Sequence, residues 1–164
     1  MEEILGFNNL KIGQQVKVKG LPGPEGGFTA FQIEIKPSRP QSTLIGLLQN
    51  VDLRRNTLRM LDRQFTVPDA CVITDLNGSL MGMVDLRPTT RVKLKGVYSE
   101  AEGFLLQKIE VAAALGFNID KIEGAIDHLD EASKTLKVVG FTVLANRRTM
   151  IEGVSDLALE TAYV

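Results

Sequence analysis

The chain contains one histidine and one cysteine, and neither is accompanied by the residues that metal binding or catalysis would require. His128 stands between Asp127 and Asp130, and these three side chains form the one candidate metal site that we find. Histidine ligands usually occur together with further good ligands, so we interpret His128 as a solvated turn residue. Cys71 lacks a nearby histidine or lysine that would lower its pKa, and we interpret it as a buried apolar residue. We therefore predict no metal ion and no cofactor.

The remaining groupings that could support catalysis are incomplete. A Ser-His-Asp set would have to recruit His128, and the paired carboxylates Glu100 and Glu102 lie at a predicted hairpin tip rather than in a cleft. The glycine-rich segment 21–27 has no Lys-Ser or Lys-Thr pair and opens no helix, so it is not a phosphate-binding loop. We therefore predict no catalytic residues and no enzymatic activity.

Four arginines, Arg54, Arg55, Arg59 and Arg63, form the clearest candidate binding face. Three of them fall in two predicted turns, and Arg59 lies on the short strand between these turns. Proteins that bind single-stranded nucleic acid also need aromatic side chains on which bases stack. Phe65 is the only aromatic residue of this hairpin, and its place in the alternation predicts that it points inward. A solvated surface and a weak nucleic-acid or glycan site therefore both remain open.

Composition limits the class of protein. The 164 residues suffice for one large domain or two small ones, and the formal net charge of −1 lacks the basic balance of many nucleic-acid-binding proteins. A single cysteine excludes an intrachain disulfide, and no apolar run is long enough to suggest a membrane helix. The N-terminal sequence MEEILGFNNL lacks the basic and apolar regions of a signal peptide. A cytosolic protein and a trimmed or mature chain both fit these features.

The sequence repeats itself with a period of about 76 residues, because QVKVKG begins at Gln15 and RVKLKG begins at Arg91 (91 − 15 = 76). A Gly-Phe pair follows each of these motifs at the same distance, at residues 27–28 and 103–104. Val16 and Val18 alternate with lysines, which is the pattern of a half-buried strand. We call this two-strand unit the back half.

A second unit, which we call the front half, is also present twice. Gly46 and Gly124 each precede an apolar strand and a polar turn, and a Thr-Leu pair follows at equal distance, at residues 57–58 and 135–136. Aligning Phe65 with Phe141 makes the hairpin of the first copy two residues longer than that of the second. The chain is therefore ordered as back, front, back, front.

The central unit, residues 43–111, predicts three strands, a short helix or helical turn over residues 76–86, and two further strands. This order is that of a five-stranded oligonucleotide/oligosaccharide-binding (OB) barrel, so we predict an all-β fold with a minor helix. Gly46 and Gly124 would allow a sharp bend of the first strand. Gly20 and Gly96 would mark a bulge or the departure into the next hairpin.

The pattern resembles an uncharacterised bacterial family of OB-like β-barrel domains that often occur in tandem in extracytoplasmic proteins. The resemblance is carried by the front halves at residues 46–67 and 124–143 and, in the back halves, by Leu10, Gly13, Val16, Val18, Gly20, Leu86, Val92, Leu94 and Gly96. The central copy departs from it where Thr89 or Thr90 replaces Gly13. The resemblance implies a barrel fold and an envelope or extracellular location, and it implies no catalytic residues.

The order of the halves predicts two barrels. Residues 43–111 form a contiguous barrel, and residues 1–37 with residues 120–164 form a second one. The second barrel could close within one chain or between neighbouring chains, and head-to-tail exchange would give a ring or a filament. A fragment of a longer repeat array is the third alternative.

We predict a non-enzymatic structural or assembly module, such as the protomer of an extracellular polymer or scaffold joined by strand complementation. The alternative is an OB-fold module that binds single-stranded nucleic acid or glycan through the face from Arg54 to Arg63. The partner would be a neighbouring copy or a larger envelope assembly, with no membrane span. The candidate assembly-interface residues are Val16, Val18, Phe28, Ile33, Ile126, Leu136, Val138 and Phe141.

Overall fold

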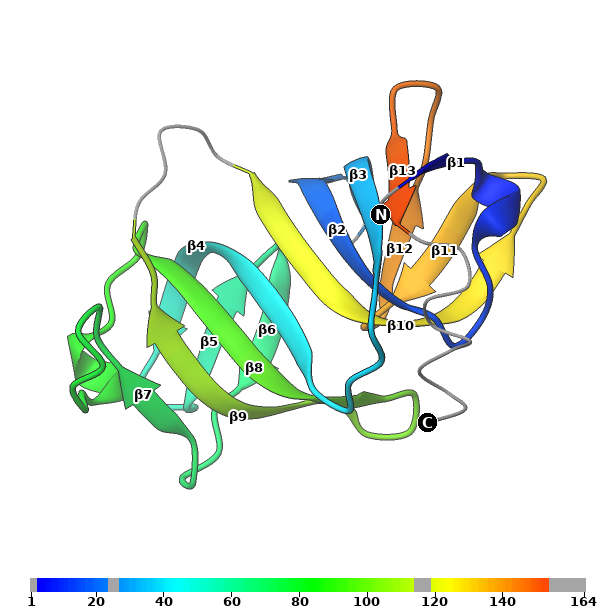
Figure 1. Cartoon of the computed structure of the whole chain (residues 1–164). Coiled ribbons are helices and arrows are strands. Elements are labelled where there is room, and N and C mark those ends of the chain that lie inside the picture. Colours follow the sequence, from blue (N-terminus) through cyan, green and yellow to red (C-terminus); the bar gives the residue numbers. More distant parts are fainter. Residues whose placement is uncertain (1–2, 24–26, 114–118, 154–164) are drawn as a thin grey trace.

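The computed structural model describes residues 3–23, 27–113 and 119–153, and within them the fold is all-β (Figure 1). The helical content there consists of two three-residue 3-10 turns, η1 (Phe7–Asn9) and η3 (Met83–Asp85). The strands form two bodies that lie side by side. The fold class predicted from the sequence, all-β with a minor helix, is confirmed.

The central part of the chain forms the body drawn in cyan and green in Figure 1, which we call the open barrel. Antiparallel pairing joins β6 to β5, β5 to β4, β4 to β8, and β8 to β9. A sixth strand, β7, pairs in parallel with β9. The strands are β4 (Ser42–Asp52), β5 (Thr57–Met60), β6 (Arg63–Thr66), β7 (Val72–Thr74), β8 (Arg91–Ser99) and β9 (Gly103–Val111).

Strands from both ends of the chain form the other body, which we call the closed barrel. Its ring is complete: β10 pairs with β11, β11 with β12, β12 in parallel with β3, β3 with β2, and β2 with β10. Outside the ring, β13 pairs in parallel with β3, and β1 pairs with β13. The strands are β1 (Glu3–Leu5), β2 (Gln15–Pro22), β3 (Gly27–Lys36), β10 (Asp120–Asp130), β11 (Thr135–Val138), β12 (Phe141–Leu144) and β13 (Met150–Gly153). Residues 154–164, which the predicted second barrel included, lie outside the described residues.

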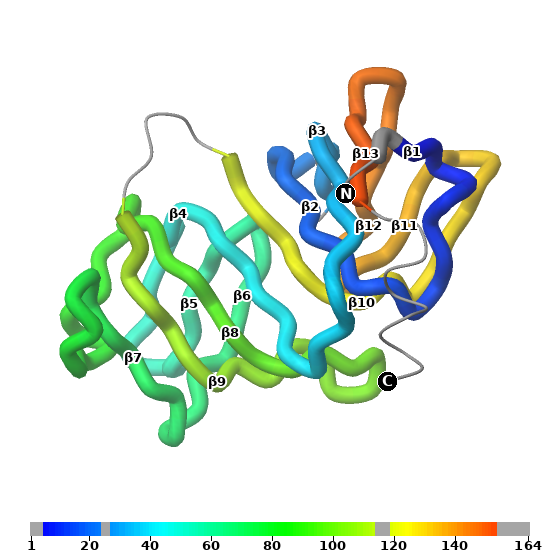
Figure 2. The backbone as a smooth tube through the Cα atoms, in the orientation of Figure 1, coloured from blue at the N-terminus to red at the C-terminus, as the bar shows by residue number. Residues whose placement is uncertain are grey.

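The two barrels are joined by pairing between β4 and β10, which lie next to each other in the middle of Figure 2. Leu44 lies opposite Ile122, and these positions are equivalent in the repeat (44 + 78 = 122, the offset between Gly46 and Gly124). A pseudo-two-fold axis therefore passes between them. A Cβ on Gly46 would lie 3.2 Å from the Asp120 carboxylate of the other barrel. The glycine thus allows the two barrels to approach closely, a role that the sequence did not suggest.

Gly20 and Gly96 lie opposite β-bulges, as predicted. The register of β2 against β3 shifts between Lys19 and Gly20, and that of β8 against β9 shifts between Lys95 and Gly96. A Cβ on Gly20 would collide with the carbonyl oxygen of the facing strand, so only glycine fits there.

Two local predictions in the central unit differ from the structure: the extent of the third strand, and the helix over residues 76–86. The third strand does not run to Thr74, because a turn in which the Cys71 amide donates to the Pro68 carbonyl (3.0 Å) separates β6 from β7. Residues 76–86 are not a helix beyond η3. Instead the Asp75 carboxylate accepts the amides of Asn77 and Ser79 (2.9 Å each), which makes a tight turn after β7.

The predicted difference in hairpin length is wrong. Both hairpins turn through two residues with positive φ, residues 61–62 and residues 139–140, and the ladders resume at Met60 with Arg63 and at Val138 with Phe141. Arg63, and not Phe65, is therefore equivalent to Phe141. Aligning the two phenylalanines by residue type introduced a two-residue shift that the backbone does not have.

The core is continuous through both bodies. The eight candidate assembly-interface residues all lie in the core of the closed barrel, where pairing within one chain covers them. They are Val16, Val18, Phe28, Ile33, Ile126, Leu136, Val138 and Phe141.

Candidate binding site

The open barrel has a gap in its ring between β6 and β9, which we call the seam. In the closed barrel the equivalent strands pair in parallel, with Thr142, Val143 and Leu144 of β12 opposite residues 27–29 of β3. Among the described residues, β6 pairs only with β5, and the corresponding part of β9 pairs only with β8. The seam therefore leaves two strand edges without a neighbouring strand.

A pocket of 510 Å³ lies at the seam. Its apolar lining includes Phe65, Phe104, Leu105 and Leu106. The rings of Phe65 and Phe104 pack edge to face with their centroids 5.8 Å apart, which holds β6 and β9 together on the core side. The volume is in the range of small-ligand pockets, and the open strand edges add backbone donors and acceptors.

Arg63 lies at the polar end of the pocket and connects the two barrels. Its Nη2 donates to the carbonyl oxygen of Gly140 (2.7 Å), and its guanidinium lies 3.9 Å from the ring centroid of Phe141. Burial lowers the pKa of Arg63, although an arginine retains its charge. Tyr98 lies on the same wall, and burial, followed by the nearby Asp127 carboxylate, raises the pKa of its hydroxyl. The pocket is thus apolar on its floor and polar beside the closed barrel.

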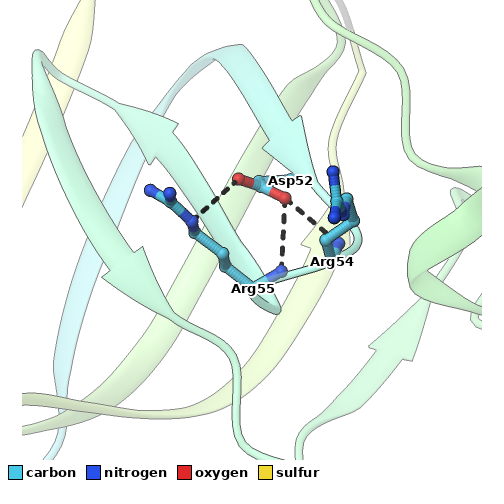
Figure 3. Close-up of polar contacts among 3 residues, drawn as sticks. All are labelled: Asp52, Arg54 and Arg55. Carbon is cyan, nitrogen blue, oxygen red and sulfur yellow. Dashed lines mark hydrogen bonds and ion pairs between the residues drawn. The ribbon is translucent and has the colours of Figure 1, made fainter.

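The other arginines of the predicted face lie elsewhere. Figure 3 shows the turn after β4, in which the Asp52 carboxylate accepts the amides of Arg54 (3.1 Å) and Arg55 (3.2 Å) and also pairs with the Arg55 side chain at 3.9 Å. Arg59 donates to the Asp62 carbonyl at 3.1 Å. The structure therefore brings Arg54 and Arg55 together in a solvated turn, beside which a hollow of 510 Å³ is lined by these two residues and Asp52.

Arg63 begins β6 rather than lying in a turn, so its predicted position is wrong. Phe65 is buried, with 7% of its surface exposed, so its predicted inward orientation is confirmed. The arginine face of the sequence is thus divided between a solvated turn and the seam.

His128 has one acidic partner. Its Nε2 lies 2.6 Å from a carboxylate oxygen of Glu100, which links β10 to the hairpin between β8 and β9. Both side chains are exposed, and the described residues contain no group of three or more His, Cys, Asp or Glu that could hold a metal ion. Cys71 is partly buried, and burial raises the pKa of its thiol, which disfavours the reactive thiolate.

An exposed apolar hairpin projects from the open barrel, and the sequence did not reveal it. Val72, Leu76, Leu80 and Val84 are all exposed, and Leu80 has 80% of its surface accessible. Leu80 forms a single bridge with Thr74, the last residue of β7. The sequence predicted a helix over residues 76–86, and a helix would have buried some of these side chains against the barrel. The exposed surface was therefore not predicted.

Comparison with known proteins gives one partial match. The family described as a domain of unknown function (DUF5666) matches residues 123–162, a stretch that begins within β10 and includes β11, β12 and β13. No curated protein and no solved structure matches the chain. The match indicates no enzymatic family. Within the described residues, no helix is long and apolar enough to cross a membrane.

Proposed function

We propose that this protein is a non-enzymatic assembly module whose copies join head to tail. In this proposal the seam of one copy receives the apolar hairpin of the next copy. The observation that carries the proposal is the difference between the two rings: β12 and β3 are paired, whereas β6 and β9 are not. A bacterial, extracellular setting and tandem OB-like barrels belong to the same proposal. The barrel fold supports the part of the proposal that concerns OB-like barrels.

The seam presents the unpaired backbone groups that the addition of a further strand requires. Met60 and Arg63 close a two-residue turn, so they form a hydrogen-bonded pair of the antiparallel ladder, and such pairs alternate along it. The backbone groups of Gln64 and Thr66 consequently point away from β5 and toward the seam. Unpaired strand edges favour pairing with a further strand, and the pocket floor can accept the apolar side chains of that strand.

The apolar hairpin supplies a complementary surface on the same molecule. A soluble monomer rarely exposes several large apolar side chains together without an interaction role. An apolar projection on one surface that fits a pocket on another gives a heterologous contact, and such a contact propagates unless its rotation closes a ring. Association by exchange of chain ends would be a different mechanism, because β2 and β3 would have to leave the closed barrel of their own chain.

Light scattering after size-exclusion chromatography, over a wide range of protein concentration, tests the proposal. We expect the mass to rise with concentration for the unaltered protein. Leu80→Asp should abolish this rise, whereas Ile12→Asp, which places a charge at a site with 65% exposure on the closed barrel, should preserve it. A mass that stays monomeric at every concentration would overturn the proposal.

The second candidate function is binding of single-stranded nucleic acid or glycan at the turn of Arg54 and Arg55. The hollow beside Asp52 and the arginine on the adjoining strand, Arg59, favour it. Reversing the charge of all three arginines should then remove a salt-sensitive affinity for oligothymidylate. Unchanged affinity in the variant would exclude this turn as the binding site.

A further inference from the structure

The pairing of β4 with β10 creates one continuous sheet across the two barrels, in the order β2, β10, β4, β8. Alternate residues of these strands are buried, for example Val18 of β2, Ile122 of β10 and Leu94 of β8. The intervening side chains therefore share the opposite face of the sheet. This face carries the four lysines of the repeated motif, Lys17, Lys19, Lys93 and Lys95, together with Lys121.

Three of these lysines form a row across the strands. Lys19 lies directly opposite Lys121, Lys121 lies opposite Ile45, and Ile45 lies opposite Lys93. Adjacent strands are about 4.8 Å apart, so the row runs perpendicular to the strands. Lys19 and Lys121 are on adjacent strands, whereas the strand that carries Ile45 separates Lys121 from Lys93. We call Lys19, Lys121 and Lys93 the first row.

The neighbouring row is related to the first by the pseudo-two-fold axis, but acidic residues compensate it. Lys17 lies opposite both Glu34 and Glu123. Lys95 and Lys108 each lie 3.0 Å from the Glu110 carboxylate. In the first row, Lys93 also lies opposite an acidic residue, Glu110, but that carboxylate pairs with Lys95 and Lys108. Within the described part of the chain, no residue of the first row forms an ion pair within 4.0 Å. The two rows therefore differ most at Lys19 and Lys121, which face each other and have Gln32 and Ile45, rather than an acidic residue, as their other cross-strand neighbours.

The first row is electrostatically unfavourable in the protein alone. Like charges directly opposite each other destabilise an antiparallel pair. Burial, followed by the charges of Lys17, Lys19, Arg91 and Lys93, lowers the pKa of Lys121. A bound anion would relieve this repulsion, whereas a purely structural surface would gain from an acidic residue here, as in the neighbouring row.

We propose that the first row binds a linear acidic polysaccharide whose carboxylate or sulfate groups lie across the strands. A row of cations on an exposed sheet face suits a polyanion that lies across the strands. Single-stranded nucleic acid fits this face less well, because its bases need successive aromatic side chains. Phe31, on the strand that flanks β2, is an exposed aromatic residue near this end of the row, and the described residues show no succession of such residues along it. Thr43, in the neighbouring row, can donate to sugar hydroxyls. Gln32, opposite Lys19, donates one amide hydrogen to Glu152 (2.9 Å) and has a second one to donate.

The test compares two triple variants with equal loss of charge. The first-row variant carries Lys19→Gln, Lys121→Gln and Lys93→Gln, and the control carries Lys17→Gln, Lys95→Gln and Lys108→Gln. The probes are polygalacturonate, which carries carboxylates, and heparin, which carries sulfates. We expect the first-row variant to lose about tenfold or more in affinity, with a weaker salt dependence, and the control to change by less than about threefold. The probe that binds more tightly identifies the acidic group.

Three results would overturn the proposal. They are a lack of binding to both polysaccharides, an equal loss of affinity in the two variants, and tighter binding of oligothymidylate or poly-glutamate than of either polysaccharide. Thermal unfolding of both variants checks that they remain folded. Both variants remove a pair of facing lysines, Lys19 with Lys121 or Lys95 with Lys108, but only the control also breaks the ion pairs of Glu110. The melting temperature of the first-row variant should therefore equal or exceed that of the control.

Discussion

The closed and open barrels share one strand order but differ at the junction that closes the ring. In the closed barrel, Phe141 begins β12, is almost fully buried, and packs edge to face on Phe28 at 6.5 Å. In the open barrel the equivalent position holds Arg63, which extends to Gly140 of the other barrel instead of entering the core. Phe104, the equivalent of Phe28, is only partly buried. The ring that closes thus has a buried aromatic residue at the start of its short strand, whereas the ring that stays open has an arginine there that binds the other barrel.

In the closed barrel, β12 and β3 already pair with each other at this junction, so a further strand cannot add there. In the open barrel, the described residues leave two strand edges unpaired beside a pocket. A repeat that duplicates a fold can therefore assign structural closure to one copy and binding to the other. Substitutions at equivalent positions of the two barrels test this division.

The largest expected difference comes from proline at the junction. Leu144→Pro removes a backbone donor from the ladder between β12 and β3 and should lower the free energy of unfolding by about 3 kcal/mol. Thr66→Pro, at the equivalent position of β6, faces the unpaired seam and should lower it by about 1 kcal/mol or less. Urea denaturation measures both values. Equal losses would show that the seam is paired in solution.

The two barrels should tolerate a methyl group differently at their equivalent glycines, Gly46 and Gly124. A Cβ on Gly124 would lie 2.5 Å from a methyl carbon of Val139, whereas a Cβ on Gly46 would lie 3.0 Å from Leu61. We expect Gly124→Ala to destabilise the protein by about 1–3 kcal/mol and Gly46→Ala to destabilise it less. Thermal unfolding of the two variants would contradict this account if Gly46→Ala proved the more damaging.

Gly13 and Thr89 occupy equivalent loop positions with positive φ, +94° and +70°. A β-branched residue is strained in this region, and nothing lies within 4 Å of a Cβ built on Gly13. Thr89→Gly should therefore stabilise the protein by about 0.5–1 kcal/mol after the added chain entropy of glycine is counted. Gly13→Ala should destabilise it by about 1 kcal/mol. Chemical denaturation that moves both variants in the same direction would refute the equivalence.

The smallest expected effect concerns Asp120, whose equivalent in the open barrel is Ser42. Burial raises the pKa of the Asp120 carboxyl above its ordinary value of 3.8. The folded protein then holds this proton more tightly than the unfolded chain, so the free energy of unfolding falls as the pH rises from that value through the raised pKa. Asp120→Ser should reduce this fall. Denaturation at a series of pH values from acidic to neutral would count against the account if the slope were unchanged.

Periodicity and repetition in the sequence predicted most of the fold. The alternation around Val16 and Val92 located two long strands, and the glycines of QVKVKG and RVKLKG located the bulges. The junction between β6 and β9 could not be predicted, because it depends on side chains that meet only after both halves pair. The lysine row was equally hidden: Lys19 and Lys121 are about a hundred residues apart in the chain (121 − 19 = 102) and meet through the pairing of β2 with β10.

The most direct test of the division between the barrels places one charge at each junction. Leu105→Glu alters the seam, and Leu144→Glu alters the sealed junction, at sites with similar exposure of 47% and 42%. Light scattering across a concentration series should show that Leu105→Glu stays monomeric while Leu144→Glu associates like the unaltered protein. Equal association of all three proteins would contradict the claim that the open barrel receives the partner copy.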